Sequence, residues 1–149
     1  MTTASNDKHG INPYLFFGGR CQEALDFYVG AIGATIDVVM RFDQSPDAMP
    51  AGMLAPGFET KVMHSSFDVG GTKILASDGC NESDGATKQG FSLALSVPTE
   101  AAADRAFNAL ADGGEVGMPL QKTFWSPRYG MVKDRFGIHW MVMVPGEMA

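Results

Sequence analysis

The sequence lacks a long hydrophobic run. No apolar segment approaches the roughly 18 residues that a membrane-spanning helix needs, so we expect no membrane partner. Cysteine is scarce as well, because Cys21 and Cys80 stand far apart and form no Cys-x-x-Cys pair. This usage favours two reduced thiols in a cytoplasmic protein over a disulfide or a zinc site.

Positive charge is also in short supply. The chain has 11 Lys and Arg against 17 Asp and Glu, which gives a net charge of −6. Basic residues near the C-terminus alternate with acidic and apolar ones instead of forming a basic face; they are Lys122, Arg128, Lys133 and Arg135. Since nucleic-acid binding requires neutralised phosphates, we expect no nucleic-acid partner.

Several motifs of nucleotide and nucleophile chemistry are missing. The sequence contains no Gly-x-Gly-x-x-Gly, no Gly-x-x-x-x-Gly-Lys-Ser/Thr loop and no Gly-x-Ser-x-Gly elbow. Chemistry driven by a bound nucleotide or by an activated serine therefore has no support from motifs.

The length and composition that are present indicate one globular domain. The chain has 149 residues, of which 45% are hydrophobic and 19% charged, as in ordinary folded proteins. The polar start has neither a basic region nor an apolar segment typical of a signal peptide. We expect residues 1–11 to be a flexible N-terminal tail and residues 12–149 to form a single domain.

The first half of the chain predicts a strand, a helix and three more strands. An apolar run over 12–18 indicates a strand, and apolar residues at helical spacing over 20–32 indicate a helix that Gly33 ends. Alternation predicts a strand over 34–42, and two more over 61–69 and 72–78 are joined by Gly70-Gly71. Between them, 43–60 is rich in proline and glycine and is expected to be a loop or lid.

The second half repeats this order after a polar connection over 79–89. Residues 91–97 indicate a strand, and a helix is expected between the N-cap Thr99 and the pair Gly113-Gly114. The segment 118–142 predicts consecutive strands with a hairpin at 134–137. Phe27 and Phe107 each precede their helix-ending glycine by six positions, which indicates an internal repeat.

The repeat predicts an α+β fold. Two βαβββ modules, module 1 at about 12–78 and module 2 at about 90–144, are expected to form a curled mixed sheet around a cleft. Each module has one helix for four strands, so one sheet face is left for another partner. Small residues at Ser92, Ala94 and Ser96 leave room for a ligand on that face or for bulky side chains of the other module.

Three features together resemble a known family: the paired modules, the run Met118-Pro-Leu-Gln-Lys-Thr-Phe-Trp125, and Asp134-x-Phe-Gly137-x-x-Trp140. The chain is similar over nearly its whole length to the PhnB-like branch of the vicinal oxygen chelate superfamily, which includes glyoxalase I, extradiol dioxygenases and bleomycin-resistance proteins. The resemblance implies a cup-shaped site and commonly a homodimer. Relatives also carry a demethylubiquinone methyltransferase label, for which the usual glycine-rich strand-to-helix crossing is missing.

Metal-dependent members of that superfamily place His, Glu or Gln ligands on the first and last strands of each module. Their pattern falls near Pro13, Ala76, Ser92 and Met141, give or take a residue. These side chains offer no set of nitrogen and oxygen donors that a divalent ion needs. The expected metal site is therefore none, and no cofactor is expected.

Polar and aromatic residues at strand positions are the candidates for a site. His64 lies mid-strand as an acid, base or hydrogen-bond donor, or as a structural histidine of the sheet. Asp78 either orients a ligand or caps a turn. Trp125 and Arg128 together suit an anionic or planar ligand; the alternatives are a dimer contact for Trp125 and a surface ion pair for Arg128. The full set of ligand-binding candidates is Phe17, Asp78, Ser92, Gln121, Trp125, Arg128 and His139. Phe91 and Tyr129 are further apolar walls.

The leading functional hypothesis is a homodimeric cup that binds a small organic molecule without metal. A second hypothesis is an enzyme, either glyoxalase-like or dioxygenase-like with unusual metal ligands or a metal-free acid–base catalyst that uses His64. A third is an interaction protein whose cleft is filled by the loop 43–60. The sequence identifies neither the ligand nor whether modules pair within a chain or between chains.

Overall fold

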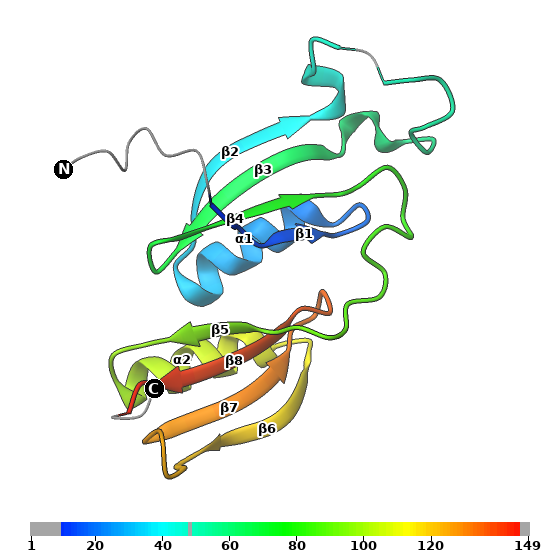
Figure 1. Ribbon diagram of the computed structural model, residues 1–149. Coiled ribbons are helices and arrows are strands. Elements are labelled where there is room, and N and C mark those ends of the chain that lie inside the picture. Colours follow the sequence, from blue (N-terminus) through cyan, green and yellow to red (C-terminus); the bar gives the residue numbers. More distant parts are fainter. Residues whose placement is uncertain (1–9, 48, 147–149) are drawn as a thin grey trace, which may run out of the picture.

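The computed structural model describes residues 10–47 and 49–146, which form two helices and eight strands (Figure 1). In chain order the elements are β1 (Tyr14–Phe16), α1 (Cys21–Ile32), β2 (Thr35–Arg41), the short 3-10 turns η2 (Phe42–Gln44) and η3 (Phe58–Thr60), β3 (Val62–Val69), β4 (Thr72–Ser77), β5 (Leu93–Ser96), α2 (Glu100–Ala111), β6 (Glu115–Gln121), β7 (Arg128–Lys133) and β8 (His139–Val144).

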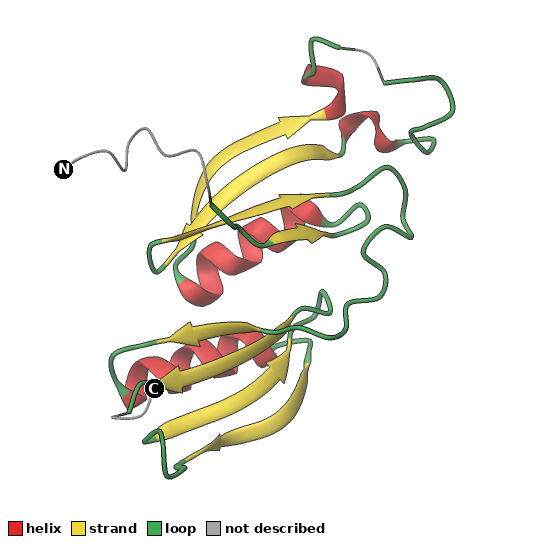
Figure 2. Ribbon diagram, viewed as in Figure 1, coloured by secondary structure: helices red, strands yellow, loops and turns green. Residues whose placement is uncertain are grey.

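The strands form two four-stranded sheets of the same topology. Sheet 1 has the order β1-β4-β3-β2, and sheet 2 has the order β5-β8-β7-β6. In sheet 1, β1 pairs in parallel with β4, and in sheet 2, β5 pairs in parallel with β8. The other strand pairs of both sheets are antiparallel. Figure 2 shows one helix for each sheet. The predicted α+β fold of two βαβββ modules is thus confirmed, with the mixed sheet in two separate parts.

Each helix covers one face of its own sheet. Helix α1 buries Ala24, Leu25 and Tyr28, which fall at helical spacing on one side. Helix α2 buries Ala103, Ala106, Phe107 and Leu110 in the same way. Thr99 accepts a hydrogen bond at Oγ1 from the Ala102 amide over 3.0 Å, which satisfies one of the open N–H groups at the start of α2.

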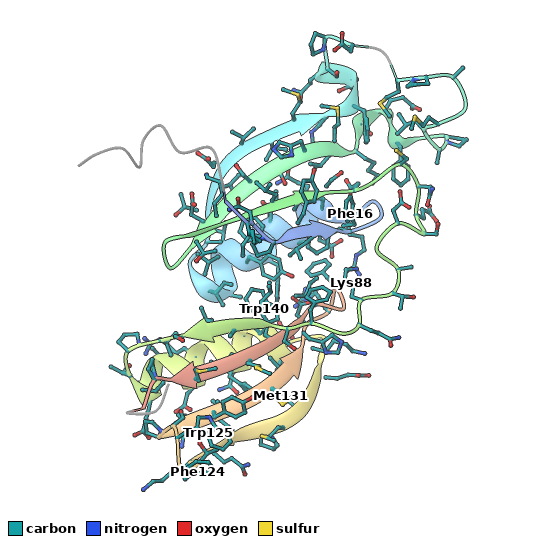
Figure 3. All side chains as sticks on the ribbon, viewed as in Figure 1. Phe16, Lys88, Phe124, Trp125, Met131 and Trp140 are labelled. Carbon is teal, nitrogen blue, oxygen red and sulfur yellow. The ribbon has the colours of Figure 1, made fainter. Side chains whose placement is uncertain are left out.

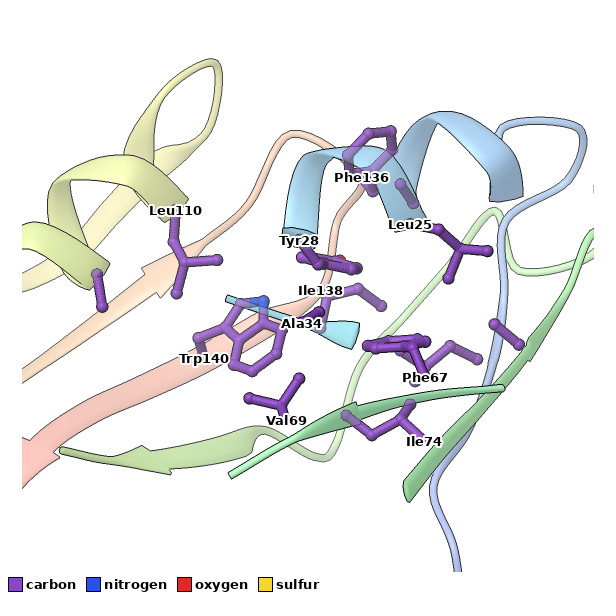
Figure 4. Close-up of a cluster of buried hydrophobic side chains, with 14 of the residues drawn as sticks. Leu25, Tyr28, Ala34, Phe67, Val69, Ile74, Leu110, Phe136, Ile138 and Trp140 are labelled. Carbon is purple, nitrogen blue, oxygen red and sulfur yellow. The ribbon is translucent and has the colours of Figure 1, made fainter. Parts of the chain in front are cut away.

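The helix-covered faces of both sheets share one hydrophobic core. Tyr28 of α1 is fully buried and stacks on Phe67 of β3, with ring centroids 5.7 Å apart. Its other side meets Trp140 of β8 edge-on at 5.6 Å, so it bridges the two modules (Figure 4). Phe136, from the hairpin between β7 and β8, packs against Tyr28 and Phe27 of module 1.

A buried carboxylate fixes this contact between modules. Asp134 accepts hydrogen bonds at Oδ2 from the Tyr28 hydroxyl at 2.5 Å and from Trp140 Nε1 at 2.8 Å. Its Oδ1 accepts from the backbone N–H groups of Phe136 and Ile138. We call this arrangement the Asp134 clamp. Burial and the Asp134 carboxylate raise the pKa of Tyr28, so its hydroxyl remains a hydrogen-bond donor.

The connection over 79–90 is held against module 1. Gly85 lies so close to β1 that an added Cβ would stand 2.2 Å from the Phe16 carbonyl oxygen, and its φ of +79° also requires glycine. Lys88 reaches back to donate to the Gly85 carbonyl oxygen. The loop after β2 is anchored too, through buried Phe42 and Phe58 and through a bond from the Ala55 amide to the Cys80 carbonyl oxygen.

The predicted elements match the observed ones with small shifts at their ends. The helix predicted over 20–32 is Cys21–Ile32, and the strand predicted over 61–69 is Val62–Val69. The loop 43–60 contains two single 3-10 turns that the sequence did not indicate. Apart from Gly10 and Ile11, the predicted N-terminal tail lies outside the described residues.

Candidate functional site

Each sheet has a second face that no helix covers. Strand alternation assigns side chains to the two faces, because neighbouring residues point in opposite directions and directly paired residues point in the same one. We call the uncovered sides the sheet-1 open face and the sheet-2 open face. Large apolar side chains on the first include Tyr14, Phe16 and Val38, which are 41%, 42% and 45% exposed. Such exposure on an otherwise packed sheet indicates a contact surface.

His64 lies on the sheet-1 open face, opposite Met40 of β2. Its Nδ1 is 3.1 Å from the Tyr14 hydroxyl, and the two rings lie 5.9 Å apart. Burial raises the pKa of Tyr14, so the phenol is protonated near neutral pH. The contact fits two tautomers of His64: Nδ1 accepts a hydrogen bond from the Tyr14 hydroxyl when the ring proton is on Nε2, and donates to that hydroxyl oxygen when the proton is on Nδ1.

The sheet-2 open face is built of three rows across the strands. Pairing between β6, β7 and β8 sets the rows, with Ala94 and Ser96 of β5 added at the edge. The polar row is Glu115, Lys133 and His139; the methionine row is Met118, Met131, Met141 and Ala94; the aromatic row is Gln121, Tyr129, Met143 and Ser96. Ser92, just before β5, lies beside His139 in the same hollow.

The aromatic row ends in a larger aromatic cluster. Trp125, in the turn between β6 and β7, meets Tyr129 edge-on with ring centroids 5.4 Å apart. Phe124 meets Trp125 at 4.8 Å and is itself 85% exposed. The turn is held by Ser126, which is buried and donates from Oγ to the Val144 carbonyl oxygen. Trp125 therefore stands at a fixed place at one end of the sheet-2 open face.

Two hollows lie at the other, polar end. The first, of about 160 Å³, is lined by residues that include Ser92, Glu115, Met131, Lys133 and His139. The second, of about 360 Å³, lies between the connection 86–89 and the β7–β8 hairpin, and Lys88, Lys133 and His139 line it. Lys133 and His139 belong to both hollows, so these hollows are neighbours.

Five of the predicted site residues lie on or beside the open faces. His64 is on the first open face, and the second brings together the other four, which are Ser92, Gln121, Trp125 and His139. Phe91 is 48% exposed and precedes β5, outside the rows.

The other three predicted ligand-binding residues have partners elsewhere. Phe17 is buried in the core against Phe136. Asp78 is buried and accepts from the backbone amides of Gly19, Cys21 and Val62, each over 2.7–2.8 Å. The Arg128 guanidinium turns to α2 and binds Asp104 with Nε and Nη2. These contacts match the structural alternatives of a turn cap and a surface ion pair.

Sequence reasoning missed the methionines and Tyr14. Their signal was the alternation itself, since Met141 and Met143 flank the buried Val142, and Met131 and Tyr129 flank the buried Gly130. The outward positions of β7 and β8 hold large thioethers and an aromatic ring. They therefore form an apolar contact surface, unlike the polar face that a solvent-exposed sheet usually has.

The residues at the superfamily's metal positions do not fit a divalent ion. Ala76 is buried on the helix-covered face, and the open-face neighbours on β1 and β4 are Tyr14 and Leu75. On sheet 2 the paired positions are Ala94 and Met141. Apart from the Tyr14 hydroxyl, this set offers no nitrogen or hard oxygen donor, whereas such ions require several. Among residues 10–47 and 49–146, no three His, Cys, Asp or Glu residues come together as a metal cluster.

In the same part of the chain, neither helix is long and apolar enough to cross a membrane. Helix α1 and helix α2 each have 12 residues, which is well short of a span.

Comparison with known proteins finds similarity over nearly the whole chain. Protein YjdN of Escherichia coli strain K12 is 33% identical over 141 residues, which cover 90% of this chain and 94% of YjdN. The solved structure of protein PA1353 from Pseudomonas aeruginosa is 39% identical, with a TM-score of 0.76 and coverage of 93% and 98%. The PhnB protein of Bacillus cereus, described as a 3-demethylubiquinone-9 3-methyltransferase, is 26% identical, with a TM-score of 0.75 and coverage of 91% and 99%.

The family model described as 3-demethylubiquinone-9 3-methyltransferase matches residues 9–143. The paired modules have the architecture of glyoxalase and bleomycin-resistance proteins, as the motifs around Trp125 and Asp134 suggested. The chain therefore belongs to this family, and it has the fold that the resemblance to the PhnB-like branch of the vicinal oxygen chelate superfamily implied.

Proposed function

We propose that this protein binds a small organic molecule without a metal ion, as a homodimer in the cytoplasm. The observation that carries the proposal is the sheet-2 open face, where thioether and aromatic side chains are only half buried although each strand is tightly packed on its other side. Ordered apolar surface of this kind stabilises bound ligands, while Gln121, Ser92 and His139 can orient them. Metal-independent binding is favoured by the apolar side chains at Leu75, Ala94 and Met141.

Exposed aromatic residues on the open faces support the homodimer. Phe16 and Phe124 are large, apolar and solvent-exposed, and they lie on different modules. A second copy would bury such residues, as interfaces rich in aromatic side chains do. Two thiols without a disulfide, at Cys21 and Cys80, support the cytoplasmic location.

Native mass spectrometry of untagged protein taken directly from cells tests the proposal. We expect a dimer that carries a small organic molecule and no stoichiometric metal. Titration with Zn²⁺, Ni²⁺, Mn²⁺ and Fe²⁺ should give no site of one ion per chain. Binding of one equivalent that is lost in His64→Ala or His139→Ala would contradict metal independence, and a strictly monomeric mass would contradict the dimer.

The Tyr14–His64 pair favours a second candidate, a metal-free acid–base enzyme. In the tautomer in which His64 donates from Nδ1 to the Tyr14 hydroxyl oxygen, its Nε2 is free on the open face and can act as a general base. Turnover that depends on pH and is abolished by His64→Ala, but not by Ser92→Ala, would support this candidate over simple binding.

The methyltransferase description of the family finds less support in the chain's own residues. The turn from β1 to α1 contains Gly18 and Gly19, but its N–H groups at Gly19 and Cys21 already donate to Asp78. An added Cβ at Gly18 would stand 2.6 Å from the Glu82 carbonyl oxygen, so the connection fills this turn. The backbone donors that cradle a nucleotide-like methyl donor elsewhere are thus occupied here.

A further inference from the structure

The three rows of the sheet-2 open face differ in chemistry, and this difference suggests what the face binds. The polar row holds Lys133 and His139 beside Glu115 and has the ammonium of Lys88 as a neighbour, the methionine row is apolar and polarisable, and the aromatic row ends at Trp125. In Figure 3, Lys88, Met131 and Trp125 follow one another across the molecule. We propose that the ligand is an organic anion with a flat apolar body, whose charged group lies at Lys133, His139 and Lys88 and whose body lies on the methionine row. This inference rests on the proposed binding function.

The charge at the polar end supports an anionic group. Seven residues line the larger hollow: Ala86, Thr87, Lys88, Gln89, Lys133, Gly137 and His139. Two of them are lysines and none is acidic, in a chain whose net charge is −6. Lys133 has one carboxylate partner, Glu115 at 3.1 Å, but that carboxylate side chain is 74% exposed and holds it weakly.

Lys88 adds a partly buried ammonium to this hollow. Its Nζ donates to the Gly85 carbonyl oxygen and lies 5.6 Å from the centre of the Phe17 ring. No carboxylate among the described residues forms a salt bridge with it, and burial lowers its pKa. An anionic ligand would supply the missing counter-charge.

The dimensions of the face set the size of the apolar body. Lys133, Met131 and Tyr129 follow each other along β7 at every second residue, so successive rows lie about 7 Å apart. Three rows therefore span about 14 Å, the length of a two- or three-ring aromatic acid. Flexible thioethers adapt to such rings and make favourable sulfur–aromatic contacts. Trp125 closes the far end.

A pair of dyes that share one ring system tests the charge and the body separately. The probes are 8-anilino-1-naphthalenesulfonate, which carries an anionic group, and N-phenyl-1-naphthylamine, which lacks it. Fluorescence titrations should show tighter binding of the sulfonate to the wild-type dimer. Lys133→Met and Lys88→Met should each lower the affinity for the sulfonate dye by about tenfold, because a charged hydrogen bond to the sulfonate is lost. The affinity for the neutral dye should not change.

Met131→Gln tests the apolar body and should weaken both dyes. Should that variant fail to fold, as judged by circular dichroism, Met141→Gln on the neighbouring strand takes its place. The matched control is Arg105→Met, which removes one positive charge from the exposed side of α2 and should change neither affinity.

The outcomes separate this inference from the proposed function. Equal affinity for the two dyes, or a sulfonate affinity that Lys133→Met and Lys88→Met leave unchanged, would overturn the anionic assignment while binding itself stands. If Met131→Gln leaves the affinity for both dyes unchanged, the apolar body of the ligand does not lie on the methionine row, and the inference is overturned too. If neither dye binds the folded dimer or raises its melting temperature, the inference and the small-molecule function both fail.

Discussion

At the scale of single residues, Asp134 has more partners than any other buried acid described here. Four donors reach one carboxylate, and two of them, the hydroxyl of Tyr28 and the indole N–H of Trp140, belong to the two modules. A buried charge is tolerated only when its hydrogen-bonding capacity is filled, as it is here. Asp134 was expected within the hairpin at 134–137, and its bond to Tyr28 of module 1 is a finding of the structure.

Loss of either side of the Asp134 clamp should destabilise the fold. Asp134→Ala leaves several buried donors without an acceptor, and we expect the free energy of unfolding to fall by about 4 kcal/mol. Tyr28→Phe leaves the carboxylate with one partner fewer and should cost about 2 kcal/mol. Urea unfolding measures both, with Tyr129→Phe as a control because that ring lies on the open face. Equal stability of Tyr28→Phe and wild type would contradict the role of the bond.

Cys21 should make the protein sensitive to alkaline pH. Its thiol is fully buried, and burial raises its pKa from 9.0 to about 12. The unfolded chain therefore ionises first, so this stability is present below about pH 9 and is lost as pH rises towards about 12. The largest possible loss is about 4 kcal/mol.

The comparison of wild type with Cys21→Ser isolates this effect, because serine does not titrate and can keep the contact with Ser65. Urea unfolding at about pH 7 and about pH 10.5 should show a stability loss that is smaller in the variant by about 2 kcal/mol. Parallel losses in the two proteins would exclude Cys21 as the cause.

At the scale of elements, the Asp78 carboxylate holds the β1–α1 turn, the start of α1 and the start of β3 together. It accepts from three backbone amides of the β1–α1 turn and β3, and it lies at the positive N-terminal end of α1. A side chain 57 positions away from Cys21 thus caps a helix whose own N-cap, Arg20, makes no side-chain cap.

The roles of cap and ligand-binding residue predict different results for Asp78→Ala. As a cap, the change should lower the free energy of unfolding by about 3 kcal/mol, since buried amides lose their acceptor. Thr99→Ala, which removes the local cap of α2, should cost about 1 kcal/mol and serves for comparison. Thermal unfolding with and without the dyes named above measures both; an Asp78→Ala protein of normal stability but weaker dye binding would favour the ligand-binding role.

The elements themselves could be predicted because their signals are local. Alternation over 61–69 and the helical spacing of Ala103, Ala106, Phe107 and Leu110 need no knowledge of distant residues. The site could be predicted only in part. For Arg128 a ligand contact and a surface ion pair were both expected as alternatives; it binds Asp104, which is 24 positions away on α2, and no local pattern indicates that partner.

Register explains the rest of the difference. Two irregularities in the pairing of β6 with β7, between Val116 and Met118 and between Met118 and Gln121, decide which side chains share a row. Such shifts follow from tertiary packing, and the sequence alone does not reveal them. Phe17 was expected at the ligand for a different reason. It shares the core side with Leu15, while Phe16 takes the open face, and the alternation of so short a strand does not show which side the helix covers.

At the scale of the whole molecule, the two modules should depend on each other for folding. They share one core, and the Asp134 clamp joins them. We therefore expect fragments 1–89 and 90–149 to remain unfolded separately, since each would expose half of the core to water. Circular dichroism and amide NMR of each fragment, and of their equimolar mixture, measure this; a cooperative melting transition in either fragment alone would contradict it.

The clamp also breaks the symmetry of the duplicated fold. Tyr28 of α1 corresponds in the repeat to Asn108 of α2, which is exposed, and the hairpin of module 1 turns at Gly70-Gly71 without an acid. In the bond between the modules, module 1 supplies the phenol and module 2 supplies the carboxylate. A chain made of two copies of either half would therefore lack the bond. Each module now depends on a residue that only the other module carries, so duplicating one half does not restore the contact.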